Sequence, residues 1–235
     1  MQIADARINR LMALAALGIA VLYIASVPIG TLTGLPGGDA SGATIARFIG
    51  EHRGGILAAV VLNGIAWCTL MPCVFVGLRA LLGGTAATVA MICAAVEAAI
   101  VGVALTFGAV LAYGAPDLGP QLAKVLMDGF DLGTNASAWP TVPCLLALVV
   151  AARRSGAFSR PTLAFAGLVA LLHAITAVSF ARSGALSPSG IAVAGPGAFA
   201  ILMILVGAAL LRRPLAGEAT DGPADVALTA SAART

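Results

Sequence analysis

The chain has 235 residues, of which 60% are hydrophobic and 10% are charged. Soluble domains carry roughly 25% charged residues, so this composition excludes a water-soluble fold and favours a membrane protein. The net charge is +3, but no basic face with interleaved aromatic side chains accompanies it, so we expect no nucleic-acid partner.

Apolar stretches suited to membrane helices account for most of the chain. A helix needs about 20 residues to cross a hydrocarbon core of about 30 Å. The stretches are apolar on every side and rich in Ala and Leu, which favours helices over the alternating strands of a membrane barrel. There are six such stretches: residues 11–35, 55–78, 85–113, 137–152, 161–181 and 189–211.

We therefore expect an all-α bundle of six transmembrane helices that forms a single domain, residues 1–213. The segment 214–235 has no periodic apolar face, so it is predicted to be a disordered cytoplasmic tail.

Two connections between the apolar stretches are predicted to contain short amphipathic helices at the membrane surface. In the first, residues 36–54, Ser41 is a suitable N-cap and Ile45, Phe48 and Ile49 share one side. The second connection, residues 114–135, has its apolar residues at helical spacing: Leu118, Leu122, Val125 and Leu126.

Basic residues are distributed unevenly between the two ends of the predicted helices. Nine lie at one end: Arg7, Arg10, Arg79, Arg153, Arg154, Arg160, Arg212, Arg213 and Arg234. Four lie at the other: Arg47, Arg53, Lys124 and Arg182. Because Lys and Arg in short loops tend to stay in the cytoplasm, both termini are predicted to be cytoplasmic. We expect a multi-pass protein of the inner (plasma) membrane, with the lipid bilayer as its main partner.

One acid, Glu97, lies inside an apolar stretch. It belongs to a stripe of mostly small residues at helical spacing, and small residues let membrane helices approach closely, so Glu97 is predicted to point into the bundle. The stripe consists of Ala86, Ala90, Ala94, Glu97, Val101, Ala104 and Gly108. An ionised carboxylate near mid-membrane costs about 2.5 kcal/mol or more, so this group should be protonated, hydrogen-bonded or paired.

Few polar residues in the other apolar stretches can meet Glu97. Asn63 and Trp67 are one turn apart and share a helix face, and His173 lies on a face of small residues. We predict a polar cluster of Glu97, Asn63 and His173, which are the candidate catalytic residues, with Trp67 as an aromatic lid. Pro72 is predicted to kink its helix.

The mouth of this cluster is predicted to involve charged residues of the outer connections. Arg53 and Glu51 are expected to hold the first amphipathic helix at this mouth, with Asp131 within reach across the gap. Trp67, Arg53 and Asp131 are therefore the candidate ligand-binding residues. Two His and four Cys occur without zinc-motif spacing, so we expect no metal and no cofactor.

Four short motifs follow the same order as in a known family of bacterial membrane proteins. They are Glu51-His52-Arg53-Gly54, Ala95-Val96-Glu97-Ala98, Asp131 with Leu132 and Gly133, and Ser159-Arg160-Pro161-Thr162. On these motifs, residues 10–213 resemble the six-helix family catalogued as domain of unknown function 4386. The resemblance implies the fold and the membrane location, and it implies no activity. The chain has Gly129-Phe130-Asp131 where that family has an Arg-Asp-Trp-like step.

Three classes of function remain open. The first is a site that binds or modestly transports a small apolar or amphipathic molecule, with Glu97 taking or giving a proton. The second is a membrane-embedded acid/base enzyme of the isomerase or cyclase type, in which a neutral Glu97 protonates an isoprenoid-like substrate and Asn63 and His173 orient it. The third is an accessory or structural subunit, in which Glu97 fixes helix register. A homo-oligomer or a larger complex is compatible with each class. A cavity with Glu97 paired to His173 favours the first two, and a dry, closed bundle favours the third.

Overall fold

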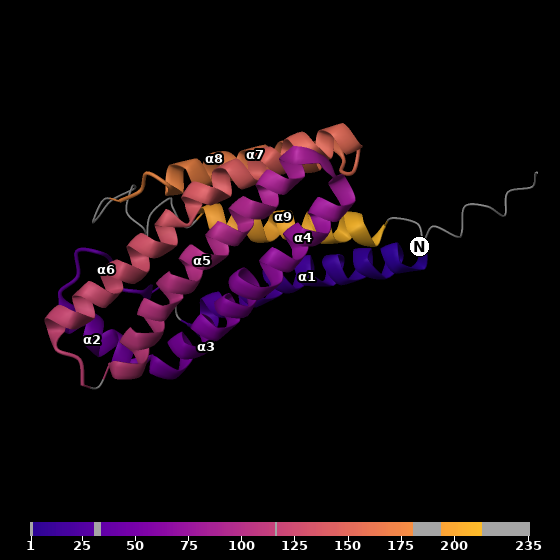
Figure 1. Cartoon of the computed structure of the whole chain (residues 1–235). Helices are drawn as coiled ribbons and strands as arrows, with labels where there is room; N and C mark the ends of the chain where they lie inside the picture. The colour runs from indigo at the N-terminus through magenta and orange to yellow at the C-terminus, as the bar shows by residue number, and fades with distance from the viewer. Residues whose placement is uncertain (1, 31–33, 116, 181–193, 213–235) are drawn as a thin grey trace, which may run out of the picture.

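A computed structural model describes residues 2–30, 34–115, 117–180 and 194–212, and all regular structure in these ranges is helical (Figure 1). The predicted tail, 214–235, lies outside the described residues. The helices in chain order are α1 (Gln2–Ile29), α2 (Gly42–Glu51), α3 (Arg53–Asn63), the π-helix η2 (Gly64–Leu70), α4 (Met71–Leu82), α5 (Gly84–Gly114), α6 (Pro120–Ala136), α7 (Ala138–Ser155), α8 (Arg160–Thr176) and α9 (Ala194–Leu211).

Five helical segments within the described residues are long and apolar enough to cross a membrane. They are Arg7–Ile29, Arg53–Leu82, Gly84–Gly114, Pro120–Ser155 and Ala194–Leu211. The remaining apolar helix, α8, is shorter. These helices confirm the prediction of an all-helical fold of the membrane type.

The long segment Arg53–Leu82 changes its helical geometry in the middle. Pro72 has no backbone N–H and its ring crowds the preceding turn, which the sequence predicted to kink the helix. Just before the proline the helix widens into η2, and the Met71 N–H bonds to the Ala66 carbonyl five residues back. Single π-turns of this kind occur often at functional sites. Here the wide turn carries Trp67.

Helices α2 and α6 form a cap over one end of the bundle (Figure 1). Ser41 caps α2 as predicted, since its hydroxyl accepts the Thr44 N–H at 3.2 Å. The apolar face of α2 was predicted to lie on the membrane surface. Ile45 and Ile49 are instead fully buried in a cluster that includes Met127 of α6. The two amphipathic helices bury their apolar faces against protein.

The apolar residues predicted at helical spacing in the second connection do not all lie on the buried face of α6. Ala123, Leu126 and Met127 are buried, whereas Leu122 and Val125 are half or more exposed. The apolar periodicity alone could not distinguish a lipid-facing from a protein-facing side, because both are apolar in a membrane protein.

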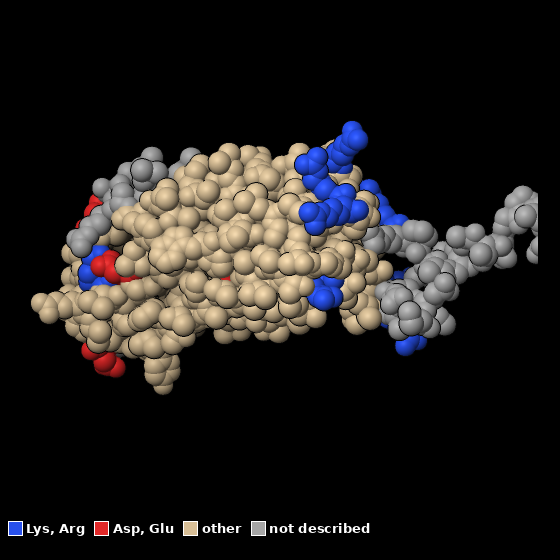
Figure 2. Space-filling model, turned by 45° about the horizontal axis from the view of Figure 1, so that its top comes forward, with Lys and Arg blue, Asp and Glu red and all other residues tan. Residues whose placement is uncertain are grey.

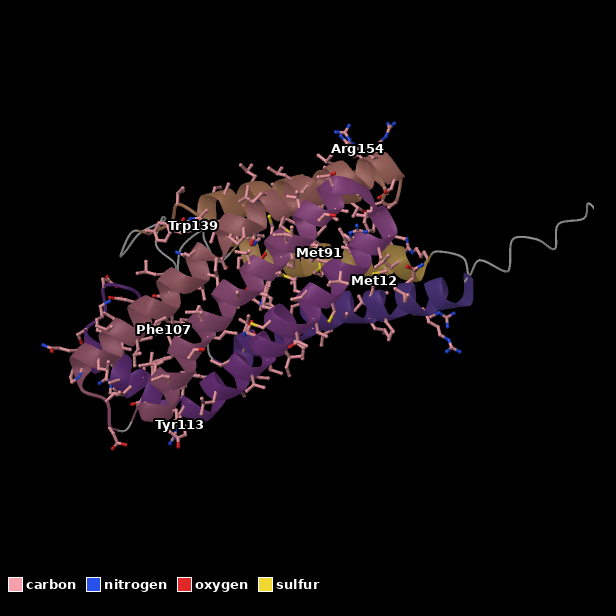
Figure 3. All side chains as sticks on the ribbon, in the orientation of Figure 1. Met12, Met91, Phe107, Tyr113, Trp139 and Arg154 are labelled. Carbon is pink, nitrogen blue, oxygen red and sulfur yellow. The ribbon has the colours of Figure 1, made fainter. Side chains whose placement is uncertain are left out.

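Charged side chains gather at the two ends of the molecule and leave a broad, nearly uncharged band between them (Figure 2). One end carries basic residues from α1, α4, α7 and α8, with Arg154 labelled in Figure 3. The other end carries acids together with Arg47, Arg53 and Lys124. A band of this kind is the surface expected where helices meet hydrocarbon.

Glycines allow close helix contacts, and one of them sets the position of the cap. A Cβ at Gly42, the first residue of α2, would overlap the Pro120 carbonyl oxygen at the start of α6. Lys124 adds a second tie, because its ammonium pairs with Asp128 and donates to the Gly38 carbonyl at 2.7 Å. The cap is thus fixed by backbone contact as well as by apolar burial.

This contact predicts a difference between two glycines of the same helix. Gly42→Ala should lower the free energy of unfolding by about 1–3 kcal/mol, because the methyl group has no room. Gly50→Ala is the matched control, since a Cβ there meets nothing within 4 Å. That variant should be neutral or more stable by up to about 1 kcal/mol. Thermal unfolding in detergent measures both, and equal effects of the two variants would contradict the packing described.

Candidate functional site

A cavity of about 470 Å³ lies inside the bundle and reaches from the cap to the membrane-embedded core. Along α5 its wall runs from Glu97 to Leu111, which corresponds to roughly 20 Å at 1.5 Å per residue. Ile49 and Met127 line it in the cap, and Trp67 and His173 line it in the core. The cavity is therefore long relative to its volume, and most of its lining side chains are apolar.

The small-residue stripe of α5 faces protein, as predicted. Ala90, Ala94, Glu97, Val101, Ala104 and Gly108 are buried. The opposite face is exposed and carries Ile92, Val96, Val103, Phe107 and Val110. Because α5 packs against both α6 and α7 through its small residues, Glu97 is held inside the bundle at the inner end of the cavity.

The Glu97 side chain is only 2% exposed, and its Oε2 atom has no hydrogen-bond partner. The Thr141 hydroxyl of α7 is its side-chain hydrogen-bond partner. That hydroxyl also lies 2.8 Å from the Ser137 carbonyl, to which it donates. A hydroxyl has one proton, so it can donate to only one of these two oxygens at a time. An ionised carboxylate is costly in this apolar setting, which favours a neutral Glu97.

His173 and Asn63 line the same cavity, but each bonds to its own helix. The His173 Nδ1–H donates to the Val169 carbonyl at 2.9 Å, which leaves Nε2 of a neutral ring as an acceptor. The Asn63 amide nitrogen donates to the Ala59 carbonyl at 2.9 Å. Although all three predicted residues are in the described part of the chain, no hydrogen bond or ion pair joins Glu97 to His173 or Asn63. The three side chains line one cavity without bonding to one another.

Trp67 lies within an aromatic wall at the inner end of the cavity. Its ring contacts Tyr23 of α1, with centroids 6.0 Å apart, and Phe199 of α9, with centroids 5.1 Å apart. Phe199 also meets the His173 ring edge-on at 6.0 Å. The sequence predicted Trp67 as a lid, whereas the side chain is 6% exposed and built into the core. Tyr23 and Phe199 were missed. The polar hydroxyl of Tyr23 inside an apolar stretch was an available signal, and Phe199 gave none.

The two charged candidate residues, Asp131 and Arg53, lie in different places in the structure. Asp131 of α6 lines the cavity, whereas Arg53 does not. The Arg53 guanidinium lies over the Tyr113 ring, 5.3 Å from its centroid, and makes no ion pair with Asp131. Tyr113 points away from the bundle in Figure 3. The structure thus brings Glu97, His173, Asn63, Trp67 and Asp131 to one cavity and leaves Arg53 outside it.

Comparisons with known proteins provide no relative from which a function could be inferred, so the functional argument rests on the cavity. The chain matches no protein-family model, and searches of curated proteins and of solved structures find no match. Among the described residues, no group of three His, Cys, Asp or Glu side chains is placed to hold a metal ion.

Proposed function

We propose that the protein is an integral membrane protein that binds a small apolar or amphipathic molecule in the cavity around Glu97. The cavity volume of about 470 Å³ falls within the range of roughly 300–1,000 Å³ typical of small-molecule sites, and the mixture of apolar walls with a few polar groups is also typical. Modest transport of the same molecule is compatible with the site, with Glu97 taking or giving a proton.

One observation carries this proposal: Glu97 lines the cavity, and the Oε2 atom of its buried carboxyl has no hydrogen-bond partner. An unsatisfied buried polar group costs about 1–3 kcal/mol. A carboxyl that served only to fix helix register would be satisfied by a neighbouring helix. A bound molecule would supply the missing partner here, which favours a binding site over a structural subunit.

A membrane-embedded acid/base enzyme is the second candidate function. The specific observation in its favour is that a carboxyl donor and an imidazole acceptor, Glu97 and His173, line one cavity. A neutral carboxyl could protonate an alkene or epoxide of an isoprenoid-like substrate, and the imidazole could receive the proton. The absence of a direct Glu97–His173 pair makes binding the better supported function.

The proposed topology has six crossings, with α8 as the fifth, in an inner (plasma) membrane. The 17 residues of α8 span about 26 Å at 1.5 Å per residue, close to the hydrocarbon thickness. The helix runs beside α7 in Figure 1. The basic end of the bundle would be cytoplasmic, which places both termini there. This arrangement also agrees with the resemblance to domain of unknown function 4386.

Cysteine labelling tests this topology. Ser155→Cys, in the exposed end of α7, should react with a membrane-impermeant reagent only from the cytoplasmic side. Ala43→Cys, exposed in α2, should react only from the opposite side. Inside-out and right-side-out vesicles give the two measurements. Reaction of both positions from one side would contradict the proposed arrangement.

Binding to the cavity can be tested with a neutral rod-shaped fluorophore, diphenylhexatriene, in nonionic detergent. Trp67 serves as the energy donor in a Trp139→Phe background, since the chain has two tryptophans and Trp139 is exposed outside the cavity. We expect saturable energy transfer. Val101→Phe should weaken binding about tenfold or more, because Val101 lines the cavity and the larger ring occupies it.

Val103→Phe is the matched control, because Val103 lies two residues away on α5 and is 60% exposed. It should bind as the parent does. Melting temperatures of both variants check that they fold. Transfer that does not saturate, or that both substitutions affect equally, would contradict a binding site in the cavity.

A further inference from the structure

The side-chain donors along the cavity are largely bonded to backbone carbonyls. The His173 Nδ1–H and the amide nitrogen of Asn63 bond within their own helices, as described above. The same holds for the hydroxyls of Thr134 and Ser137, which donate to Asp131 and Thr134 carbonyls at 2.9 and 2.6 Å. Among the lining residues, the acceptors left without a hydrogen bond are Glu97 Oε2, His173 Nε2 and Asn63 Oδ1. The remaining donors are uncharged: the Tyr23 hydroxyl, the Trp67 indole N–H and the second N–H of the Asn63 amide.

In the described part of the chain, acidic residues line the cavity without Lys or Arg residues to balance them. Two acids, Glu97 and Asp131, line it, and no Lys or Arg does among the described residues. Gly129 and Gly133 of α6 pack against Phe107 and Ala104 of α5.

These packing contacts put Asp131 about eight residues, or roughly 12 Å, outward from Glu97 along α5. The nearest ammonium, Lys124, is held by Asp128 and the Gly38 carbonyl. A positive charge that enters the cavity therefore meets acids at two depths.

Aromatic rings stand at the inner end beside Glu97. Trp67 and Tyr23 line the cavity there and pack against each other edge to face. Such rings attract organic cations through their π faces, Trp most strongly. The remaining walls, with residues such as Val101, Leu105 and Ile56, are apolar and extend toward the cap. This combination suits a charged head with a long apolar tail.

We propose that the cavity binds a lipophilic organic cation, an amine or quaternary ammonium with an apolar tail, whose charge rests against the Glu97 carboxyl. This inference rests on the proposed binding function and specifies its ligand. The charges of the lining residues exclude an anionic head, because an anion would face two carboxyl groups and no Lys or Arg among the described residues. A cation brings the countercharge that an ionised Glu97 lacks in the membrane.

Cation binding should exchange a proton at Glu97. Burial without a cation favours the neutral carboxyl in the empty cavity. That carboxyl must ionise to pair with a permanent cation, so one proton leaves as one cation enters. Other titratable groups around it are Cys93 of α5 and Cys144 of α7. Tyr23 of α1, His173 of α8 and Asp131 of α6 line the same cavity. Affinity for a permanent cation should therefore rise with pH, and affinity for a neutral rod should not.

Three probes that share one rod test the charge preference: diphenylhexatriene, its trimethylammonium derivative and its propionate derivative. Energy transfer from Trp67 in nonionic detergent, in the Trp139→Phe background, measures each. The parent should bind the cation at least about tenfold more tightly than the anion. Glu97→Gln keeps the size of the side chain and should weaken cation binding about 30-fold or more, since one partner of a buried charge pair is lost. It should leave neutral-rod binding within about threefold.

The matched control is Glu51→Gln, because Glu51 is an exposed acid of the cap that does not line the cavity. It should leave all three affinities unchanged. Equal binding of the three rods, or cation binding independent of pH, would overturn the cation assignment in the parent protein even if Glu97→Gln does not fold. Saturable neutral-rod binding in those cases would keep the binding site. No saturable transfer from any rod would reject the site and the assignment together.

Discussion

A buried carboxyl held in an apolar bundle with one oxygen unsatisfied constrains the rest of this structure. Glu97 is 2% exposed, and the described residues provide it with no cation. An ionised group would carry a large desolvation cost at this depth. The neutral form reduces that cost, and the Thr141 hydroxyl is the side-chain hydrogen-bond partner of the carboxyl. The second oxygen remains for something that enters the cavity.

The helices around Glu97 leave space instead of closing on it. Small residues bring α5 close to α6 and α7, which fixes the carboxyl in place. The π-turn η2 before Pro72 carries Trp67, which forms an aromatic wall with Tyr23 and Phe199. The cap formed by α2 and α6 covers the outer end through apolar contacts. A rigid wall and an irregular helix together maintain a long cavity.

The sequence predicted the elements that depend on strong, local signals. The apolar stretches, the Ser41 cap and the inward face of Glu97 follow from composition, capping chemistry and the small-residue stripe. It also selected five residues that line the cavity, because polar side chains are costly in a membrane and few are present. Their arrangement was not predictable. Direct contact between Glu97, Asn63 and His173 was expected, but each of the latter two bonds its own helix, a choice that depends on rotamers. Arg53 lies over Tyr113 for a similar reason, since an exposed cation has several partners of similar energy.

Infrared difference spectroscopy of the Glu97 carboxyl is the most direct test of this account. The protonated acid has a carbonyl stretch that can be assigned by its loss in Glu97→Gln. The account predicts that this band is present in the empty protein, shifts when diphenylhexatriene fills the cavity, and disappears when the trimethylammonium derivative binds. A band that is absent at neutral pH, or that stays unchanged when the cavity is saturated by either ligand, would contradict the central role given to Glu97.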